Sequence, residues 1–355
     1  MGTNIIAFVI VLGVLIFFHE FGHFLIARLF GVGVEKFSLG FGPRLVGKKV
    51  GITDYRLSAI PLGGYVKMVG EEPDAEIAPE DLPLSFTHKH VAKRMLIVAA
   101  GPVFNILLAI IIFFGIFYFT GTFILKASIG SVRAGSPALA AGLEKGDEIT
   151  RINGKAVGSW DEMAEIINAS RGRTLNLSVH RQDATLEFSI TPEKVTTKNI
   201  FGEDIQRYVI GITASGESFS KEMGLFQAMS ESLLQTYRVT ELMVVIIAKL
   251  IKGEVSTNTL GGPIMIAQMA GDSAKAGVGS LISFIAVISI NLAIINLLPI
   301  PILDGGHLLF FAIEAVKGRP VSIKVREVAQ QVGLFILILL MILVFYNDIT
   351  RIFFS

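Results

Sequence analysis

The sequence contains no cysteine, and only 17% of its 355 residues are charged. The lack of cysteine excludes disulfides and thiolate-bound metals, so any metal site must use histidine and carboxylate. Soluble domains are typically about a quarter charged. With 52% hydrophobic residues and a mean hydropathy of +0.64, the composition indicates a membrane protein with a polar portion. The net charge of +1 argues against a nucleic-acid partner.

Long apolar runs predict four membrane-spanning helices, since about 20 apolar residues cross the hydrocarbon core of a bilayer. The predicted spans are Ile5–Phe30, Met95–Thr120, Ser280–Leu303 and a fourth that begins with Val332–Phe345. A further apolar stretch, Leu225–Lys252, is interrupted by charged residues. It predicts an amphipathic helix at the membrane interface or against the bundle.

The first span contains His19, Glu20 and His23 in an HExxH sequence. Ionisable side chains are costly within a bilayer and therefore mark a functional site by default. Residues four apart lie on one face of a helix, so both histidines can bind one metal ion. Glu20 can then act as a general base toward a metal-bound water. The spacing predicts a Zn²⁺ site with Glu20 as its catalytic residue.

A zinc site with two histidines needs a third ligand, and none follows His23 at short spacing. The end of the third predicted span supplies Asp304, followed by Gly-Gly and His307. Prolines and paired glycines at membrane depth are tolerated where they line a cavity in the protein. Asp304 would complete a His₂–carboxylate zinc site. His307 is the rival ligand, and it could instead orient another group through a hydrogen bond.

The second predicted span carries Gly101 and Asn105 near its start. A small residue and an amide four residues apart suit close helix packing and a hydrogen bond between helices. The alternative is a packing helix with no role at the site. The basic cluster just before this span, residues 88–94, predicts a cytoplasmic membrane anchor.

Two polar segments have the patterns of β structure. Gly51–Met68 predicts a β-hairpin that is broken at Gly63-Gly64. Residues 123–195 predict a soluble α+β insert, which resembles a PDZ domain through the pattern AGLxxGDxIxxINGxxV. PDZ domains bind an extended peptide C-terminus as an added strand. A module that only blocks or sorts access to the site is an equal alternative.

These elements predict a mainly α-helical polytopic membrane protein with four transmembrane helices, a membrane-associated β-hairpin and one inserted PDZ-like α+β domain. The expected parts are 1–122 with HExxH and the hairpin, 123–195 as the insert, 196–275 as a linker with the amphipathic helix, and 276–355 with the last two spans. Basic residues near the span ends place the active site toward the cytoplasm and the insert in the periplasm.

The HEFGH sequence, the PDZ pattern and NLLPIPILDGGH occur in this order, together with FSLGFGP, PLGGYVKM, GPVFN and TLGGPI. The chain resembles the site-2 protease family of intramembrane zinc metalloproteases, peptidase family M50, over nearly its whole length. It is most similar to the RseP-like bacterial regulators of sigma-E activity. The resemblance implies that His19, His23 and Asp304 bind zinc and that Glu20 is the catalytic base.

The resemblance also implies which residues contact the substrate: Asn296, Pro299, and Gly63, Gly64, Tyr65 and Val66 of a membrane-dipping hairpin. It implies a multi-pass protein of the bacterial inner membrane that cleaves single-span membrane proteins, such as anti-sigma factors already trimmed outside and remnant signal peptides. The best-studied members carry two tandem PDZ domains, whereas this chain has room for one. A size filter made of two modules is therefore not expected.

Other functions fit parts of the sequence. A non-catalytic membrane scaffold would recruit partners through its PDZ-like domain and keep a structural metal site. A metal transporter would use the same intramembrane ligands, but four spans without internal repeats or further ligands provide no evident pathway. An aspartyl intramembrane protease would need a second aspartate facing Asp304.

Overall fold

The computed structural model describes residues 2–72, 77–199, 203–256 and 260–354, and the chain divides into two compact units. The membrane unit comprises residues 1–116 and 229–355. The inserted unit comprises residues 117–228. The membrane unit is thus built from two separate pieces of the chain.

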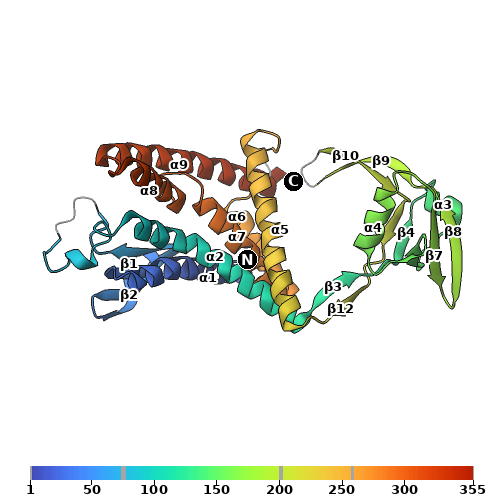
Figure 1. Cartoon of the computed structure of the whole chain (residues 1–355), viewed down its shortest axis with the longest axis horizontal. Coiled ribbons are helices and arrows are strands. Elements are labelled where there is room, and N and C mark those ends of the chain that lie inside the picture. The colour runs from blue at the N-terminus through green and yellow to red at the C-terminus, as the bar shows by residue number, and fades with distance from the viewer. Residues whose placement is uncertain (1, 73–76, 200–202, 257–259, 355) are drawn as a thin grey trace. The chain divides into compact units, whose positions relative to one another are not determined.

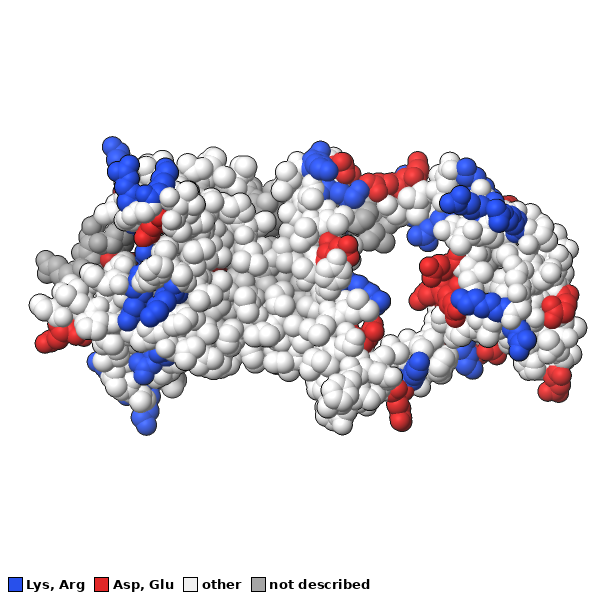
Figure 2. Space-filling model, in the orientation of Figure 1, with Lys and Arg blue, Asp and Glu red and all other residues white. Residues whose placement is uncertain are grey.

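Four helices of the described chain are long and apolar enough to cross a membrane: α1 (Gly2–Leu29), α2 (Val91–Thr120), α7 (Val278–Asn296) and α9 (Ile323–Phe354). Figure 2 shows a broad uncharged band across the membrane unit, with charged side chains toward its ends. The predicted fold class is confirmed. The third span ends at Asn296 rather than at Leu303, since the prolines that follow cannot continue a helix.

Apart from the two helices of the inserted unit, three further helices and a short 3₁₀ turn (η1, Leu82–Leu84) complete the helical elements of the described chain. They are α5 (Leu225–Ile251), α6 (Pro263–Ala276) and α8 (Asp304–Lys317). α5 is amphipathic and is not among the candidate spans of the described chain, in agreement with its predicted role.

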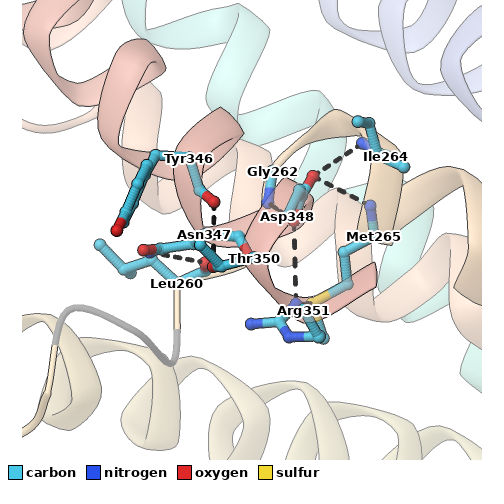
Figure 3. Close-up of polar contacts among 9 residues, drawn as sticks. All are labelled: Leu260, Gly262, Ile264, Met265, Tyr346, Asn347, Asp348, Thr350 and Arg351. Atoms are coloured by element: carbon cyan, nitrogen blue, oxygen red, sulfur yellow. Dashed lines mark hydrogen bonds and ion pairs between the residues drawn. The ribbon is translucent and has the colours of Figure 1, made fainter. Parts of the chain in front are cut away.

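A carboxylate on α9 caps the N-terminus of α6 (Figure 3). Asp348 is 2% exposed, and it accepts hydrogen bonds from the backbone N–H groups of Gly262, Ile264 and Met265 at 2.9, 3.0 and 3.1 Å. The first N–H groups of a helix have no partner within the helix and favour negative charge nearby. Asp348 therefore ties α9 to α6 with a buried, fully used carboxylate.

α6 in turn packs on α1. The apolar cluster that joins them also includes residues of α2 and α7: Ala7, Val11, Leu15, Leu108, Ala270, Phe284 and Ile285. The backbones of α1 and α6 approach closely at Gly271, where a Cβ atom would collide with Asn4. Because all these residues are nearly inaccessible, the helix that carries HExxH is held on several sides within the membrane unit.

β1 (Val34–Val50) and β2 (Thr53–Met68) form the predicted hairpin, but its turn lies at Gly51-Ile52. The predicted break at Gly63-Gly64 is wrong, since both glycines lie within β2. The two long strands fold back on themselves, so that Leu39 pairs with both Gly64 and Leu57. Residues 64–68 are thus paired with β1 on one edge, and their other edge pairs with no strand in the described chain.

The inserted unit is an α+β fold (Figure 1). Its main sheet has the order β6-β5-β7-β8, from Lys155–Ala156, Glu148–Ile152, Leu175–Arg181 and Ala184–Ile190. The helices α3 (Pro137–Ala141) and α4 (Trp160–Ala169) complete it. The core is apolar and almost inaccessible, with Ile129, Leu143, Ile149, Leu177 and Val179 at 0–1% exposure.

The segment predicted to be a linker after residue 195 contains strands of this unit. β9 (Glu193–Lys198) pairs with β10 (Asp204–Val209), β11 (Ile212–Ala214) pairs with β4 (Ile129–Val132), and β12 (Ser218–Lys221) pairs with β3 (Thr122–Leu125). The strands are short and polar, so their sequence gave no hydrophobic signal. The partners of β11 and β12 lie about 80 to 100 residues earlier in the chain.

Candidate active site

The HExxH sequence lies where α1 and α2 approach most closely. A Cβ atom on Gly22 of α1 would lie 2.5 Å from the carbonyl oxygen of Ala100. A Cβ atom on Gly101 of α2 would collide with the imidazole of His23 and would lie 2.8 Å from Cε1 of His19. The two glycines therefore let the helix backbones come together and leave room for both rings.

A third side chain, that of Asp304, lies beside the two histidines and comes from the C-terminal part of the sequence. Asp304 is the first residue of α8 and follows the irregular segment 297–303. Cβ atoms on Gly305 and Gly306 would collide with the backbone carbonyls of Leu297, Leu298 and Ile300. Only glycine fits this tight reversal, which returns the chain so that Asp304 faces α1.

His19, His23 and Asp304 converge on one point. Nε2 of His19 lies 3.2 Å from Oδ2 of Asp304, Nε2 of His23 lies 3.6 Å from the same oxygen, and the two Nε2 atoms are 3.3 Å apart. Their side chains are 12%, 10% and 18% exposed. All three donor atoms lie within 4.8 Å of one another, and they form the one such group found in the described chain.

This donor set fits a zinc ion. Two imidazole nitrogens and one carboxylate oxygen are the ligands of a three-residue zinc site with one position open for water or substrate. Oδ2 of Asp304 is buried and has no hydrogen-bond partner in the described chain, which is costly unless a cation binds there. If both histidines carry their proton on Nδ1, their Nε2 lone pairs face one another across 3.3 Å, an arrangement that a shared metal ion would explain.

α2 also orients one of the two histidines. Nδ1 of His23 donates a hydrogen bond of 2.9 Å to the carbonyl oxygen of Ile97. A proton on Nδ1 leaves the lone pair on Nε2, the atom that faces His19 and Asp304. The ring of His23 is therefore held in the tautomer that a metal ligand requires.

Glu20 lies beside the cluster but outside it. It follows His19 in the sequence and is not among the converging donor atoms. A Cβ atom on Gly64 of β2 would lie 2.8 Å from Cγ of Glu20 and 2.7 Å from Cγ2 of Ile16. The sheet therefore touches the HExxH helix at the residue that could act as a base, and the lack of a side chain at position 64 allows this contact.

The other hairpin residues predicted to contact substrate lie next to Gly64. Gly63 faces the ring of Phe41, which in turn stacks on Tyr65 with 6.1 Å between ring centroids. Val66 is 9% exposed and pairs with Phe37 of β1. Residues 63–66 of this edge strand thus contact Phe41, Glu20 and the apolar core.

The structure does not bring the remaining predicted residues into the cluster. Asn296 is the last residue of α7, and its side chain makes no hydrogen bond within the described chain. Pro299 is exposed. His307 lies one turn after Asp304 on α8, outside the group of converging donor atoms.

Sequence reasoning missed an ion pair that fixes α8. Arg94 was predicted to be part of a basic membrane anchor, but it is 8% exposed and pairs with Glu314 through two hydrogen bonds of 2.5 and 3.3 Å. Its guanidinium group also lies 5.0 Å from the ring centroid of Phe311. The pair joins α2 to α8 and so supports the helix that presents Asp304. No local pattern could reveal it, since the partners are 220 residues apart.

Comparison with known proteins gives the family. The family described as peptidase family M50 matches residues 7–340. The chain belongs to peptidase family M50. A protein of Rickettsia conorii that is named as a zinc metalloprotease is 37% identical over 99% of this chain and 99% of its own length. "Regulator of sigma-E protease RseP" of Salmonella typhimurium is 34% identical over 98% of each chain.

Solved structures are similar to part of the M50 chain. The PDZ domain of the SdrC-like protein from Listeria monocytogenes is 30% identical and covers 24% of this chain and 84% of that domain, with a TM-score of 0.20. The family comparisons agree with the donor chemistry of the cluster: the protein is a metalloprotease whose cofactor is zinc.

Proposed function

We propose that this M50 protein is an intramembrane protease that cleaves single-span membrane proteins. The observation that carries the proposal is the convergence of His19, His23 and Asp304 beside Glu20, on helices apolar enough to cross a bilayer. Peptide hydrolysis at this depth needs a site that binds zinc, holds a base and admits an extended substrate. The membrane unit has a candidate for each of these parts.

His19, His23 and Asp304 would hold the metal ion. When bound, zinc supplies Lewis-acid chemistry, which acidifies a water molecule and polarises the scissile carbonyl. Glu20 takes the proton of the attacking water and passes a proton to the leaving amine nitrogen. Glu20 can do both because it neighbours a ligand on α1 and is itself outside the converging group.

The free edge of residues 64–68 provides a place for the substrate. The carbonyl groups of a transmembrane helix are hydrogen-bonded within the helix, so the substrate must unwind before attack. An extended segment can then pair with an exposed strand edge by β-augmentation. Gly64 lies against Glu20, so a segment paired with this edge would lie close to the proposed base.

The inserted unit has a groove that suits a peptide C-terminus. The groove has a volume of about 410 Å³ and lies between α4 and residues 207–212. Its apolar lining includes Met163, Ile167, Ile210 and Ile212. β11 beside it pairs with β4 on one side only in the described chain, so a peptide could add to its other edge.

We further propose a place and a class of substrate for this protease. The protein would lie in the bacterial inner membrane, with the zinc site toward the cytoplasm and the inserted unit in the periplasm, because basic residues lie in the last turns of α1 and α8. Substrates would be anti-sigma factors already trimmed outside the membrane, or remnant signal peptides. The Salmonella typhimurium relative is named as a regulator of sigma-E, which supports the first class.

Replacement of the base tests the proposed function. Glu20→Gln should lower the cleavage of a model single-span substrate in detergent by a factor of about 10² to 10⁴, the usual contribution of a general base. The zinc content should stay near that of the wild type, because Glu20 is outside the ligand group. Glu187→Gln, on the exposed part of β8, serves as the matched control. Unchanged cleavage by Glu20→Gln would overturn the role of Glu20 as the base, whereas a wild-type protein that binds zinc without cleaving the substrate would favour a scaffold with a structural metal.

A further inference from the structure

A buried amide on α2 faces the first histidine of the site. Asn105 is 0% exposed, and its Nδ2 atom lies 3.3 Å from Nδ1 of His19. Its Oδ1 atom is buried and has no hydrogen-bond partner in the described chain. A buried amide oxygen without a partner is costly, so this orientation of the amide needs an explanation.

The orientation also conflicts with a metal-binding His19. If Nε2 of His19 gives its lone pair to a metal ion, the ring proton lies on Nδ1 and needs an acceptor. The Nδ2 group of an amide is a donor only. Two donors would then face one another at 3.3 Å.

A half-turn of the amide removes both problems. The oxygen and nitrogen of an asparagine amide have nearly the same shape, and their assignment follows from the hydrogen bonds they can make. After the exchange, Oδ1 of Asn105 accepts the Nδ1–H of His19. The buried oxygen gains a partner, and His19 gains an acceptor.

The backbone around Asn105 is fixed from a third helix. The carbonyl oxygen of Asn105 accepts a hydrogen bond of 2.8 Å from Oγ of Ser289 on α7, and both groups are buried. Ile97, Gly101 and Asn105 are spaced four residues apart on α2, so they share one face of that helix. Ile97 orients His23, Gly101 leaves room for the rings, and Asn105 faces His19.

We propose that Asn105 is a positioning residue of the zinc site, whose side-chain oxygen accepts the Nδ1 proton of His19 and directs Nε2 of that ring to the metal. α2 thereby orients both histidines, one through a backbone carbonyl and one through an amide. The inference rests on the proposed zinc site but not on the substrate or on the role of Glu20.

Zinc affinity tests this role without a cleavage assay. The full-length protein in detergent is titrated with zinc against a chelator of known affinity. Asn105→Leu, which removes the acceptor, should weaken zinc binding by about 10- to 100-fold, as for other groups that orient a ligand. Asn105→Asp keeps an acceptor and should bind zinc within about threefold of the wild type. An unchanged affinity in Asn105→Leu, or an equal loss in Asn105→Asp, would overturn the proposal.

Two controls separate orientation from general damage to the helix. Ser289→Ala removes the hydrogen bond to the Asn105 backbone and keeps the amide, so zinc affinity should fall less than in Asn105→Leu; an equal fall would contradict the proposal. If Asn105→Leu does not fold, ¹⁵N spectra of histidine-labelled, zinc-loaded wild-type protein still decide. His19 should carry its proton on Nδ1, and a proton on Nε2 would overturn the proposal. Loss of activity in Glu20→Gln has no bearing on either result.

Discussion

The two units of the molecule differ in how completely they satisfy their buried polar groups. In the inserted unit, the buried carboxylate of Asp147 is fully used: it accepts two hydrogen bonds from Arg181 at 2.7 and 2.8 Å and one from the N–H of Glu144 at 2.9 Å. In the membrane unit, Oδ2 of Asp304 and Oδ1 of Asn105 are buried and accept no hydrogen bond in the described chain.

This difference indicates which unit satisfies its buried polar groups within the fold and which unit leaves some of them for a ligand. Folded proteins satisfy their buried polar groups, and exceptions gather at sites that bind something else. The inserted unit follows the rule around a conventional apolar core. The membrane unit leaves buried atoms without a hydrogen bond on Asp54 and Arg56 of the hairpin and where the proposed zinc ligands converge. At the second place, a cation and a correctly turned amide would satisfy the remaining atoms.

The largest expected effect is a core truncation in the inserted unit. Leu177 is 0% exposed, so Leu177→Ala should destabilise this unit by about 3 kcal/mol through lost contacts and a cavity. Trp160, the single tryptophan, packs against the same core, so its fluorescence during urea unfolding measures the change. The exposed Leu340 of α9 provides the control variant, Leu340→Ala.

The same variant tests whether the two units are independent. Zinc content of Leu177→Ala should equal that of the wild type, because no zinc ligand lies in the inserted unit. If zinc is lost together with the fluorescence change of Trp160, the two units are not independent. The membrane unit would then depend on the fold of the insert.

A smaller effect is expected where the sheet touches the base. Gly64→Ala places a methyl group 2.7 to 2.8 Å from Ile16 and Glu20, so Glu20 or the strand must shift. Cleavage should fall by about tenfold, a typical result of a small misplacement of a catalytic group, while zinc binding is retained. In the inserted unit, Gly158→Ala has its nearest neighbour at 3.8 Å and should leave cleavage unchanged. Full activity of Gly64→Ala would remove the edge strand from the proposed mechanism.

The smallest effect concerns the buried carboxylate of the inserted unit. Burial alone would raise the pKa of the Asp147 carboxyl, but hydrogen bonds from Arg181 and Glu144 outweigh it and hold the pKa below its usual value. A carboxyl with a lowered pKa in the folded state stabilises the fold above its unfolded pKa of about 3.9. That contribution is lost as the pH falls through the folded value.

Asp147→Asn should therefore unfold more easily than the wild type at neutral pH, by about 1 kcal/mol. The difference between the two proteins should shrink at a pH well below about 4. Urea unfolding followed through Trp160 at several pH values measures this. A difference that stays constant with pH would show that the charge of Asp147 does not stabilise the inserted unit.

Much of this arrangement could be predicted from local sequence. The spacing of His19 and His23 places them on one face of a helix. Long apolar runs predict the spans independently of contacts with the rest of the chain. Asp304 could be proposed because a metal with two histidines needs a third ligand and this residue follows a helix break. The choice between Asp304 and His307 required the geometry of the reversal at Gly305-Gly306.

Other features depend on contacts between distant segments. Nothing near Arg94 shows that Glu314 will pair with it, and nothing near residues 212–221 shows that they pair with strands before residue 133. Gly101 and Asn105 did indicate a close helix contact, but the partner of the amide depends on the side of α1 that faces α2. Local sequence patterns predicted which residue types could form the site, whereas three-dimensional packing determines which of them contact one another.

The zinc content of two variants tests most directly whether a distant carboxylate closes the HExxH site. Elemental analysis of the purified protein should find about one zinc per wild-type chain and per His307→Ala chain. Asp304→Ala should lose most of its zinc, whereas Asp272→Ala, an exposed aspartate on α6, should keep it. Stoichiometric zinc in Asp304→Ala together with its loss in His307→Ala would contradict this assignment and make His307 the third ligand.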